Sequence, residues 1–115
     1  MEDKVIWFEV MGQDGDSMQQ FYNKMFGWQL NFDNPLRYSM LDGGNGAIPG
    51  GVGLHDRGSW ATFYVRVQGI EERIQRAQEM GAQVILPIQT TPDGGKIAVV
   101  TDPEGHPIGM VQTAS

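Results

Sequence analysis

The sequence contains two copies of the same order of expected elements, and this repeat constrains the fold more than any other feature. In each copy an apolar, strand-like stretch leads into a helical pattern that a glycine ends, and short strands follow. Phe26-Gly27 aligns with Met80-Gly81, and the strand around Gly53 with that around Gly109, after a shift of about 55 residues. A repeat of only two units indicates a paired domain rather than a solenoid.

The first copy, about residues 3–56, begins with a strand expected over residues 5–10. A helix follows that Asp16 or Ser17 can cap and that Gly27 ends. A broad apolar stripe lies on one face of this helix and consists of Met18, Phe21, Tyr22, Met25 and Phe26. Further short strands are expected from Trp28, over residues 38–41 and over residues 52–55.

The second copy, about residues 59–113, follows the same plan. A strand is expected over residues 60–67, and a helix from about residue 70 to residue 80, ended by Gly81. The apolar side of this helix is formed by Ile70, Ile74, Ala77 and Met80. Strands are expected over residues 84–88, 96–101 and 108–112. Residues 1–115 therefore make one domain with both strands and helices.

Composition excludes several classes of function. The chain has 115 residues and a net charge of −6, and its 8 Lys and Arg are scattered, so we expect no nucleic-acid partner. The absence of Cys excludes disulfides, thiolate catalysis and Cys-ligated metal sites. We expect no membrane contact and a cytoplasmic location, since no stretch is apolar enough to cross a bilayer and the start lacks a secretory pattern.

Four segments in order resemble the vicinal oxygen chelate superfamily: WFEV, FY within an apolar helix ending FGW, a helix ending MGA, and DPEGHPIGMVQ. This group includes glyoxalase I, the bleomycin- and fosfomycin-resistance proteins, extradiol dioxygenases and methylmalonyl-CoA epimerase. The resemblance covers essentially the whole chain. It implies an α+β fold of two tandem βαβββ modules whose curved sheets enclose a cleft, and it implies a homodimer.

The resemblance also locates four cleft positions that hold His, Gln or Glu ligands in metal-using members of the family. In this chain the four positions carry Trp7, Gly53, Thr62 and Gly109. Trp offers only an N–H donor, Gly has no side chain, and a neutral Thr hydroxyl binds divalent ions weakly. We therefore predict no metal and no cofactor.

Strand alternation adds neighbours to these positions on the cleft face. The predicted ligand-binding residues are Trp7, Glu9, Gly53, His55, Thr62, Tyr64, Arg66 and Gly109. The set is aromatic with a few polar groups, and the two glycines are expected to open space for a flat or apolar organic ligand. Glu9 and Arg66 either orient a polar substrate or pair with each other. His55 either acts as an acid or base or lies in an exposed loop.

Three functions remain open from the sequence. The first is binding of a small organic molecule without a metal. The second is a lyase, isomerase or dioxygenase-type enzyme that uses a displaced metal or His55 and Tyr64, with Glu9 as a further catalytic candidate. The third is a non-catalytic module that binds protein. Whether the chain is an enzyme is left open, and binding of a small organic molecule is the interpretation we favour.

Overall fold

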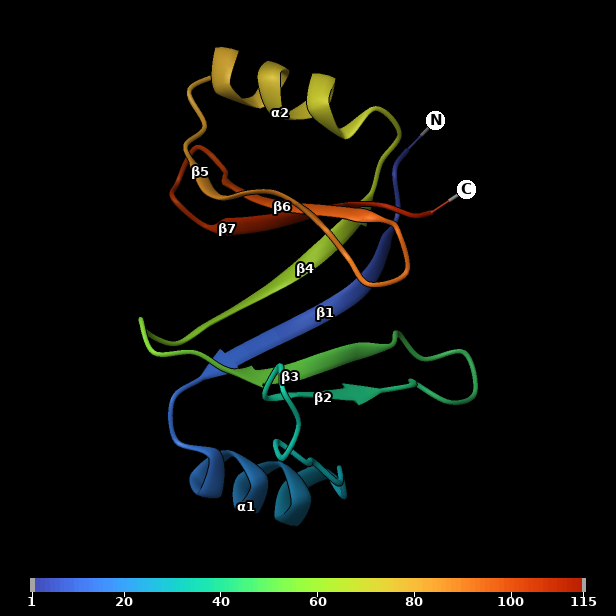
Figure 1. Ribbon diagram of the computed structural model, residues 1–115, viewed down its shortest axis with the longest axis vertical. Helices are drawn as coiled ribbons and strands as arrows, with labels where there is room; N and C mark the ends of the chain where they lie inside the picture. The colour runs from blue at the N-terminus through green and yellow to red at the C-terminus, as the bar shows by residue number, and fades with distance from the viewer. Residues whose placement is uncertain (1, 115) are drawn as a thin grey trace. The chain divides into compact units, whose positions relative to one another are not determined.

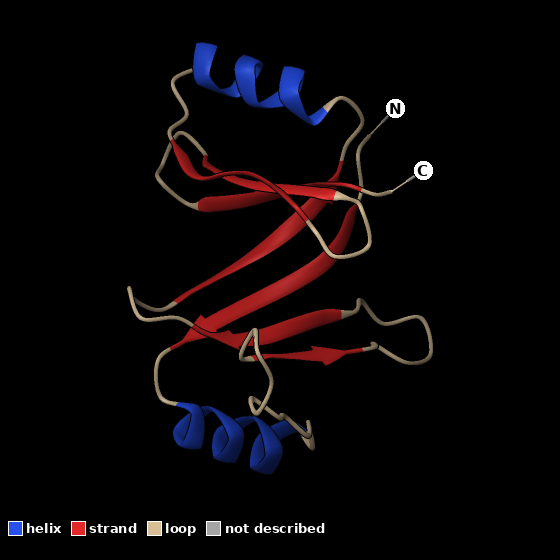
Figure 2. Cartoon of the chain, in the orientation of Figure 1, coloured by secondary structure: helices blue, strands red, loops and turns tan. Residues whose placement is uncertain are grey.

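The computed structural model describes residues 2–114 and contains seven strands and two helices over that range. The chain divides into two compact units. The N-terminal unit is Trp7–Ala61, and the C-terminal unit is Thr62–Ser115 together with Met1–Ile6. Figures 1 and 2 show helices and strands in each unit, as expected for the α+β class.

The N-terminal unit contains most of β1 (Val5–Gly12), then α1 (Gly15–Phe26), β2 (Tyr38–Leu41) and β3 (Gly50–Leu54). Strand β3 lies between β1 and β2, because it pairs in parallel with β1 and antiparallel with β2. Gly27 ends α1 with a φ of 73°, as the sequence predicts. Asp14 caps the helix instead of Asp16 or Ser17, because its carboxylate accepts the backbone N–H of Ser17.

The C-terminal unit contains most of β4 (Trp60–Arg66), then α2 (Ile70–Glu79), β5 (Val84–Thr90), β6 (Lys96–Thr101) and β7 (Pro107–Gln112). Strand β7 pairs in parallel with β4 and antiparallel with β6, and β6 pairs antiparallel with β5. Figure 1 shows α2 lying along this group of strands.

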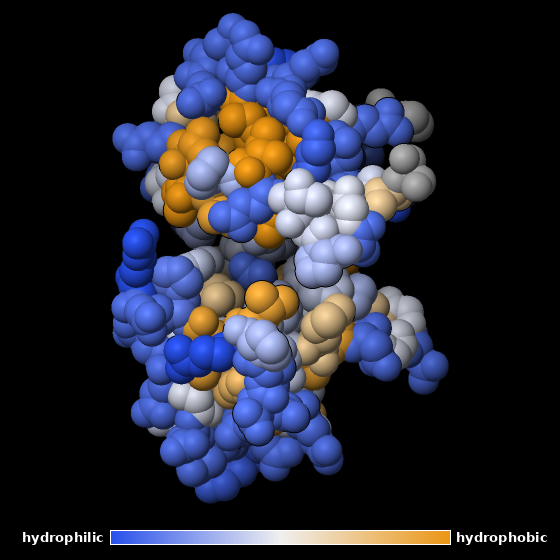
Figure 3. Space-filling view, viewed as in Figure 1, coloured by the Kyte–Doolittle hydropathy of each residue, from blue (hydrophilic) through white to orange (hydrophobic). Residues whose placement is uncertain are grey.

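The core of the C-terminal unit lies between α2 and its strands. Ile70 is fully buried and Ile74 is 9% exposed, and both pack with Val67, Ala98 and Val100. Figure 3 shows apolar residues gathered below a hydrophilic outer side of α2. Burial of each Ile side chain stabilises the folded state by about 1.5–3 kcal/mol relative to leaving it exposed to water. The expectation for Met80 is wrong, since this residue lies just beyond the helix and is 82% exposed.

Helix α1 differs from α2 because none of its residues is buried. Phe21, Met25 and Phe26 are 53%, 60% and 58% exposed, so these three residues of the apolar stripe lie at the surface. Met18 and Tyr22 are half-buried, and the Tyr22 ring stacks on Trp28 with a centroid distance of 5.1 Å.

The strand expected from Trp28 does not form. Side chains of α1 bind two carbonyls of this segment: Asn23 donates to the carbonyl of Trp28, and Gln19 to that of Leu30. The Trp28 ring also packs against Phe8 of β1 at 5.7 Å. Because helix side chains satisfy these backbone acceptors, the segment has a stable arrangement without strand pairing. This is a local difference within the expected order of elements.

Among residues 2–114, no helix has the length and apolar character needed to cross a membrane.

Candidate functional site

One face of the N-terminal unit brings together three of the four residues that the sequence predicts for its half of the site: Trp7, Glu9 and Gly53. The register aligns Glu9 with Gly51 and Met40, and it aligns Met11 with Gly53 and Tyr38. Residues aligned across neighbouring strands share a face, and Trp7 joins them two positions before Glu9. We call this surface the Tyr38 face; it comprises Trp7, Glu9, Met11, Tyr38, Met40, Gly51 and Gly53.

Tyr38 lies at the centre of a directed hydrogen-bond chain. The Trp7 Nε1–H donates to the Tyr38 hydroxyl at 3.0 Å, and the Tyr38 hydroxyl donates to Glu9 Oε2 at 3.0 Å. An indole nitrogen can only donate, so the phenol proton is directed to the carboxylate. All three side chains are half-buried, and the chain fixes their relative positions.

The backbone of Tyr38 is held by Asn34. The Asn34 amide accepts the backbone N–H of Tyr38 at 3.1 Å and donates to the Tyr38 carbonyl at 3.0 Å. The same amide also donates to the carbonyl of Asn31 at 3.0 Å. Arg37, directly before Tyr38, has a φ of 51°, a left-handed conformation that costs about 1–2 kcal/mol outside glycine. The loop is therefore held in a constrained conformation that orients Tyr38.

The glycines of β3 lie beneath the Tyr38 ring. A Cβ on Gly51 would lie 2.1 Å from Cε1 of Tyr38, and a Cβ on Gly53 would lie 2.7 Å from Cδ2. These two carbons are on opposite edges of the ring, so the ring lies flat across both glycines. The prediction that Gly53 opens space for a ligand is wrong, because the tyrosine ring fills that space. Tyr38 itself was missed by the sequence analysis.

The same relationship occurs in the C-terminal unit. Tyr64 is aligned with Gly109 on the neighbouring parallel strand, and a Cβ on Gly109 would lie 2.5 Å from Cδ2 of Tyr64. Tyr64 is only 4% exposed. The second glycine therefore accommodates a tyrosine ring and does not open space either.

Thr62 and Arg66 are the other predicted residues of the C-terminal unit. Thr62 is 8% exposed, and its hydroxyl donates to the carbonyl of Pro107 at 2.6 Å. Arg66 is exposed at the end of β4, and its backbone N–H donates to the carbonyl of Lys4. Pairing of Arg66 with Glu9 stays a prediction, because the two residues belong to different units.

His55 lies in the loop directly after β3, which ends at Leu54, so its position agrees with the loop alternative, although the side chain is half-buried. Its Nδ1 accepts the backbone N–H of Arg57 at 3.0 Å, and its ring meets Trp60 edge-on at 5.1 Å. A backbone N–H can only donate, so the neutral ring carries its proton on Nε2. His55 is half-buried and offers a donor rather than a base in this arrangement.

The second histidine, His106, belongs to a closed turn. The Asp102 carboxylate accepts the backbone N–H groups of Glu104 and His106 and also contacts the His106 ring at 2.9 Å. The backbone N–H of His106 is the main cause that lowers the pKa of Asp102 below its usual value. Both side chains therefore stabilise the turn.

In metal-using members of the family that the sequence resembles, four positions hold the metal ligands. The residues at these positions in this chain do not fit a metal ion. Gly53 and Gly109 provide no donor and lie under tyrosine rings. The indole of Trp7 and the hydroxyl of Thr62 donate to Tyr38 and to Pro107. Over residues 2–114, no cluster of three or more His, Asp or Glu side chains could hold a metal ion. That the protein works without a metal stays a prediction.

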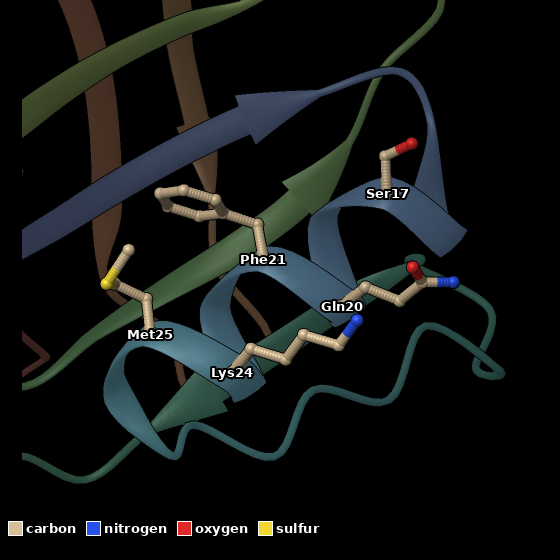
Figure 4. A pocket seen from close by; sticks show the side chains of 5 residues that line it. All are labelled: Ser17, Gln20, Phe21, Lys24 and Met25. Carbon is tan, nitrogen blue, oxygen red and sulfur yellow. The ribbon is translucent and has the colours of Figure 1, made fainter.

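A separate shallow groove runs along the exposed side of α1. It has a volume of about 460 Å³ and is lined by Ser17, Gln20, Phe21, Lys24 and Met25. Figure 4 shows Phe21 and Met25 on one side of this groove, with Gln20 and Lys24 on the other. All of its lining comes from a single helix, and it contains none of the predicted site residues.

Both a family model and curated relatives match this chain. The family model described as Glyoxalase/Bleomycin resistance protein/Dioxygenase superfamily matches residues 4–110. CFP32 of Mycobacterium bovis and of Mycobacterium tuberculosis, provisionally named a glyoxylase, is 27% identical over 117 residues, covering 92% of this chain and 44% of the relative. The chain thus spans less than half the length of these curated relatives.

Solved structures share the fold at low sequence identity. A superfamily member from Vibrio splendidus 12B01 has a TM-score of 0.66 at 19% identity, covering 97% of this chain and all (100%) of that chain. Methylmalonyl-CoA epimerase from Mycobacterium tuberculosis has a TM-score of 0.64 at 16% identity, covering 96% and 88%. A methylmalonyl-CoA epimerase in complex with methylmalonyl-CoA and NH4+ has a TM-score of 0.63 at 15% identity, covering 100% and 97%. The fold expected from the sequence is therefore confirmed.

Proposed function

The chain belongs to the Glyoxalase/Bleomycin resistance protein/Dioxygenase superfamily, and on that premise we propose that it binds a small organic molecule on the Tyr38 face without the metal used by other members. One observation carries this proposal. Tyr38 covers Gly53 with its ring and accepts the indole N–H of Trp7, so one tyrosine engages both positions of this unit that hold metal ligands in other members.

The chemistry of the Tyr38 face suits an organic ligand. Trp7, Tyr38, Met11 and Met40 offer aromatic and thioether surface, which contributes dispersion and stacking contacts. Glu9 adds a polar group whose position is fixed by Tyr38. Sites for small molecules combine mainly apolar walls with a few well-placed polar groups. The methylmalonyl-CoA complex of a structural relative supports a small organic ligand in this fold.

The second candidate is an enzyme that uses His55. The half-buried ring, with its proton directed to Nε2 by the Arg57 N–H, can donate a hydrogen bond that polarises a bound substrate. Catalysis that uses both His55 and Tyr64 stays a prediction. We rank this candidate second because His55 lies after the end of β3, outside the Tyr38 face.

Metal analysis and ligand screening test the proposal together. After dialysis against metal-free buffer, plasma mass spectrometry should find well under one divalent ion per chain. A thermal-shift panel of organic cations, neutral aromatics, organic acids and acyl-CoA thioesters should contain compounds that raise Tm, since a ligand selective for the folded state stabilises it. Trp7→Phe should weaken that response. Trp28→Phe, which alters the ring stacked on Tyr22, should not.

Two results would contradict the proposal. The first is a stoichiometric metal that survives dialysis and is lost in Glu9→Ala. The second is a panel with no response at all, which would favour a protein-binding module. Turnover of a panel compound that disappears in His55→Gln would instead establish the enzymatic candidate.

The predicted cytoplasmic location and homodimer belong to the same proposal. The exposed Phe21, Met25 and Phe26 of α1 support self-association, because large apolar patches on a surface mark interaction sites. Light scattering after size-exclusion chromatography measures the mass of the particle directly.

A further inference from the structure

We propose that Asn45 is a site of spontaneous chemical modification, at which the backbone nitrogen of Gly46 displaces the side-chain amide and water leaves a carboxylate in its place. The site lies in the loop between β2 and β3, where Gly44, Asn45 and Gly46 are all exposed. This inference is independent of the proposed function, because it concerns the reaction of an asparagine side chain with its own main chain.

The reaction needs only the chain and water. The backbone nitrogen of Gly46 attacks Cγ of Asn45, and a bond forms between these two atoms. The bond from Cγ to Nδ2 breaks, and Nδ2 leaves as ammonia with the proton of the attacking N–H. Water then opens the resulting cyclic imide at either of its two carbonyl carbons. One opening gives aspartate, and the other gives isoaspartate, in which the main chain continues through Cγ. No atom is oxidised or reduced.

Asn45 differs from the other asparagines of the chain in both its contacts and its neighbour. The chain has four asparagines, and only Asn45 is followed by glycine. The amides of Asn23, Asn31 and Asn34 each form a hydrogen bond with backbone groups. Within residues 2–114, no hydrogen bond holds the amide of Asn45. Its side chain can therefore rotate until Cγ meets the nitrogen of Gly46.

The turn at Asn45 leaves the attacking nitrogen accessible. The Ala47 N–H donates to the Gly44 carbonyl at 3.3 Å, so residues 44–47 form a β-turn with Asn45 and Gly46 at its centre. Gly46 has a φ of 80° and Asn45 is not left-handed, which is the type II pattern. The hydrogen bond of such a turn uses the N–H of the fourth residue, not that of Gly46. A Cβ on Gly46 would meet no described atom within 4 Å, so no neighbour shields this side of the turn.

The Asp-Gly pairs of the chain are the internal comparison, because an aspartate beside glycine can close the same imide with loss of water. The carboxylates of Asp14, Asp42 and Asp93 each accept a backbone N–H two or three residues later, at 3.2, 3.1 and 3.2 Å. These hydrogen bonds hold each carboxylate in place, and a carboxylate also resists attack because of its negative charge. Asn45 should therefore react while these three aspartates stay intact.

Mass spectrometry of the folded protein tests the inference. In mildly alkaline buffer at physiological temperature, the chain should gain the mass difference between an amide and an acid, at one site. Peptide mapping should find aspartate and isoaspartate at residue 45. A synthetic peptide of residues 41–50 gives the reaction rate without the fold. We expect the rate in the folded protein to lie within about tenfold of that in the peptide, because exposed loops are mobile.

Two variants test the route of the reaction. Asn45→Gln retains an amide, but its longer side chain must close a larger ring, so residue 45 should stay unmodified over the same period. Gly46→Ala places a Cβ beside the attacking nitrogen and restricts the main chain, and it should slow the reaction by about tenfold or more. Circular dichroism checks that both variants are folded. An isoaspartyl methyltransferase with labelled S-adenosylmethionine should label the aged wild type and not Asn45→Gln.

Three results would overturn the inference. The first is an Asn45 amide that survives in the folded protein while the peptide reacts completely, since the fold would then protect the site. The second is a mass gain that maps to another asparagine. The third is aspartate without isoaspartate at residue 45, because direct hydrolysis of the amide, with no imide, gives aspartate alone.

Discussion

Tyr38 and Gly53 are direct partners on adjacent antiparallel strands, and a Cβ on Gly53 would lie 2.7 Å from the tyrosine ring. Tyr64 and Gly109 repeat this relationship on a parallel pair, at 2.5 Å. A glycine in a strand forms no side-chain contacts of its own, and an aromatic residue across from it restores packing. Both glycines thus have a structural reason to be glycine that is independent of any ligand.

Gly51→Ala should destabilise the fold by about 1–3 kcal/mol, because the new Cβ overlaps the Tyr38 ring, whose hydroxyl is held by hydrogen bonds with Trp7 and Glu9. In a Tyr38→Ala background, the same substitution should cost far less, since the ring is gone. Urea denaturation of the four proteins measures this coupling. Equal costs in the two backgrounds would show that the ring is not what confines Gly51.

Asn34→Ala should destabilise the fold by about 1–3 kcal/mol, because the backbone N–H and carbonyl of Tyr38 lose their side-chain partner. The Trp7 indole N–H signal in NMR spectra should move as well, since Tyr38 receives its hydrogen bond. Asn45→Ala, in the exposed loop before β3, is the matched control and should change neither quantity. An unchanged Trp7 signal in Asn34→Ala would mean that Asn34 does not orient the tyrosine.

Arg37→Gly should be more stable than Arg37→Ala by about 1 kcal/mol, because only glycine adopts a φ of 51° without steric cost. Both variants lose the exposed contact with Asp56, which therefore cancels in the comparison. Thermal unfolding of the two variants gives the difference. If alanine is as stable as glycine, residue 37 is not left-handed in solution.

Thr62→Val should destabilise the fold by about 1–2 kcal/mol, because the hydrogen bond from the buried Thr62 hydroxyl to the carbonyl of Pro107 is lost. Thr62→Ser retains the hydroxyl and should recover a large part of this loss. Denaturant titration checks both values. Binding of panel ligands on the Tyr38 face should be unaffected, since the role of Thr62 is structural.

Asp14 should make stability depend on pH in the acid range. Hydrogen bonds from the backbone N–H and then from the hydroxyl of Ser17 lower the pKa of Asp14 below 3.8. A depressed pKa in the folded state means that the cap is fully stabilising above the unfolded value and is lost as pH falls through the folded value. Asp14→Asn retains a capping group without a charge.

The stability of the wild type relative to Asp14→Asn should therefore fall as pH drops from about 5 towards 2. Urea midpoints at a series of pH values measure it, and an NMR titration of the Asp14 carboxyl gives its pKa directly. A constant difference across this range would show that the carboxylate does not cap α1.

The sequence by itself determined the order of elements and many of their ends. The strand bounds Tyr38–Leu41 and Lys96–Thr101 agree with the pattern, and Gly27 ends its helix as predicted. Ile70 and Ile74 occupy the core side of α2, where the helical spacing placed them. These features depend on local periods of two and about 3.6 residues and on the conformational freedom of glycine, which a sequence displays directly.

Only the tertiary structure decided how the site is filled. Tyr38 reaches Gly51, Gly53, Trp7 and Glu9 because β2 pairs antiparallel with β3 in one register. The exposed stripe of α1 and the missing strand at Trp28 likewise depend on what packs against each segment. Alternation along β2 places Tyr38 and Met40 on one face, but the register that assigns this face to the site is set by contacts between distant parts of the chain.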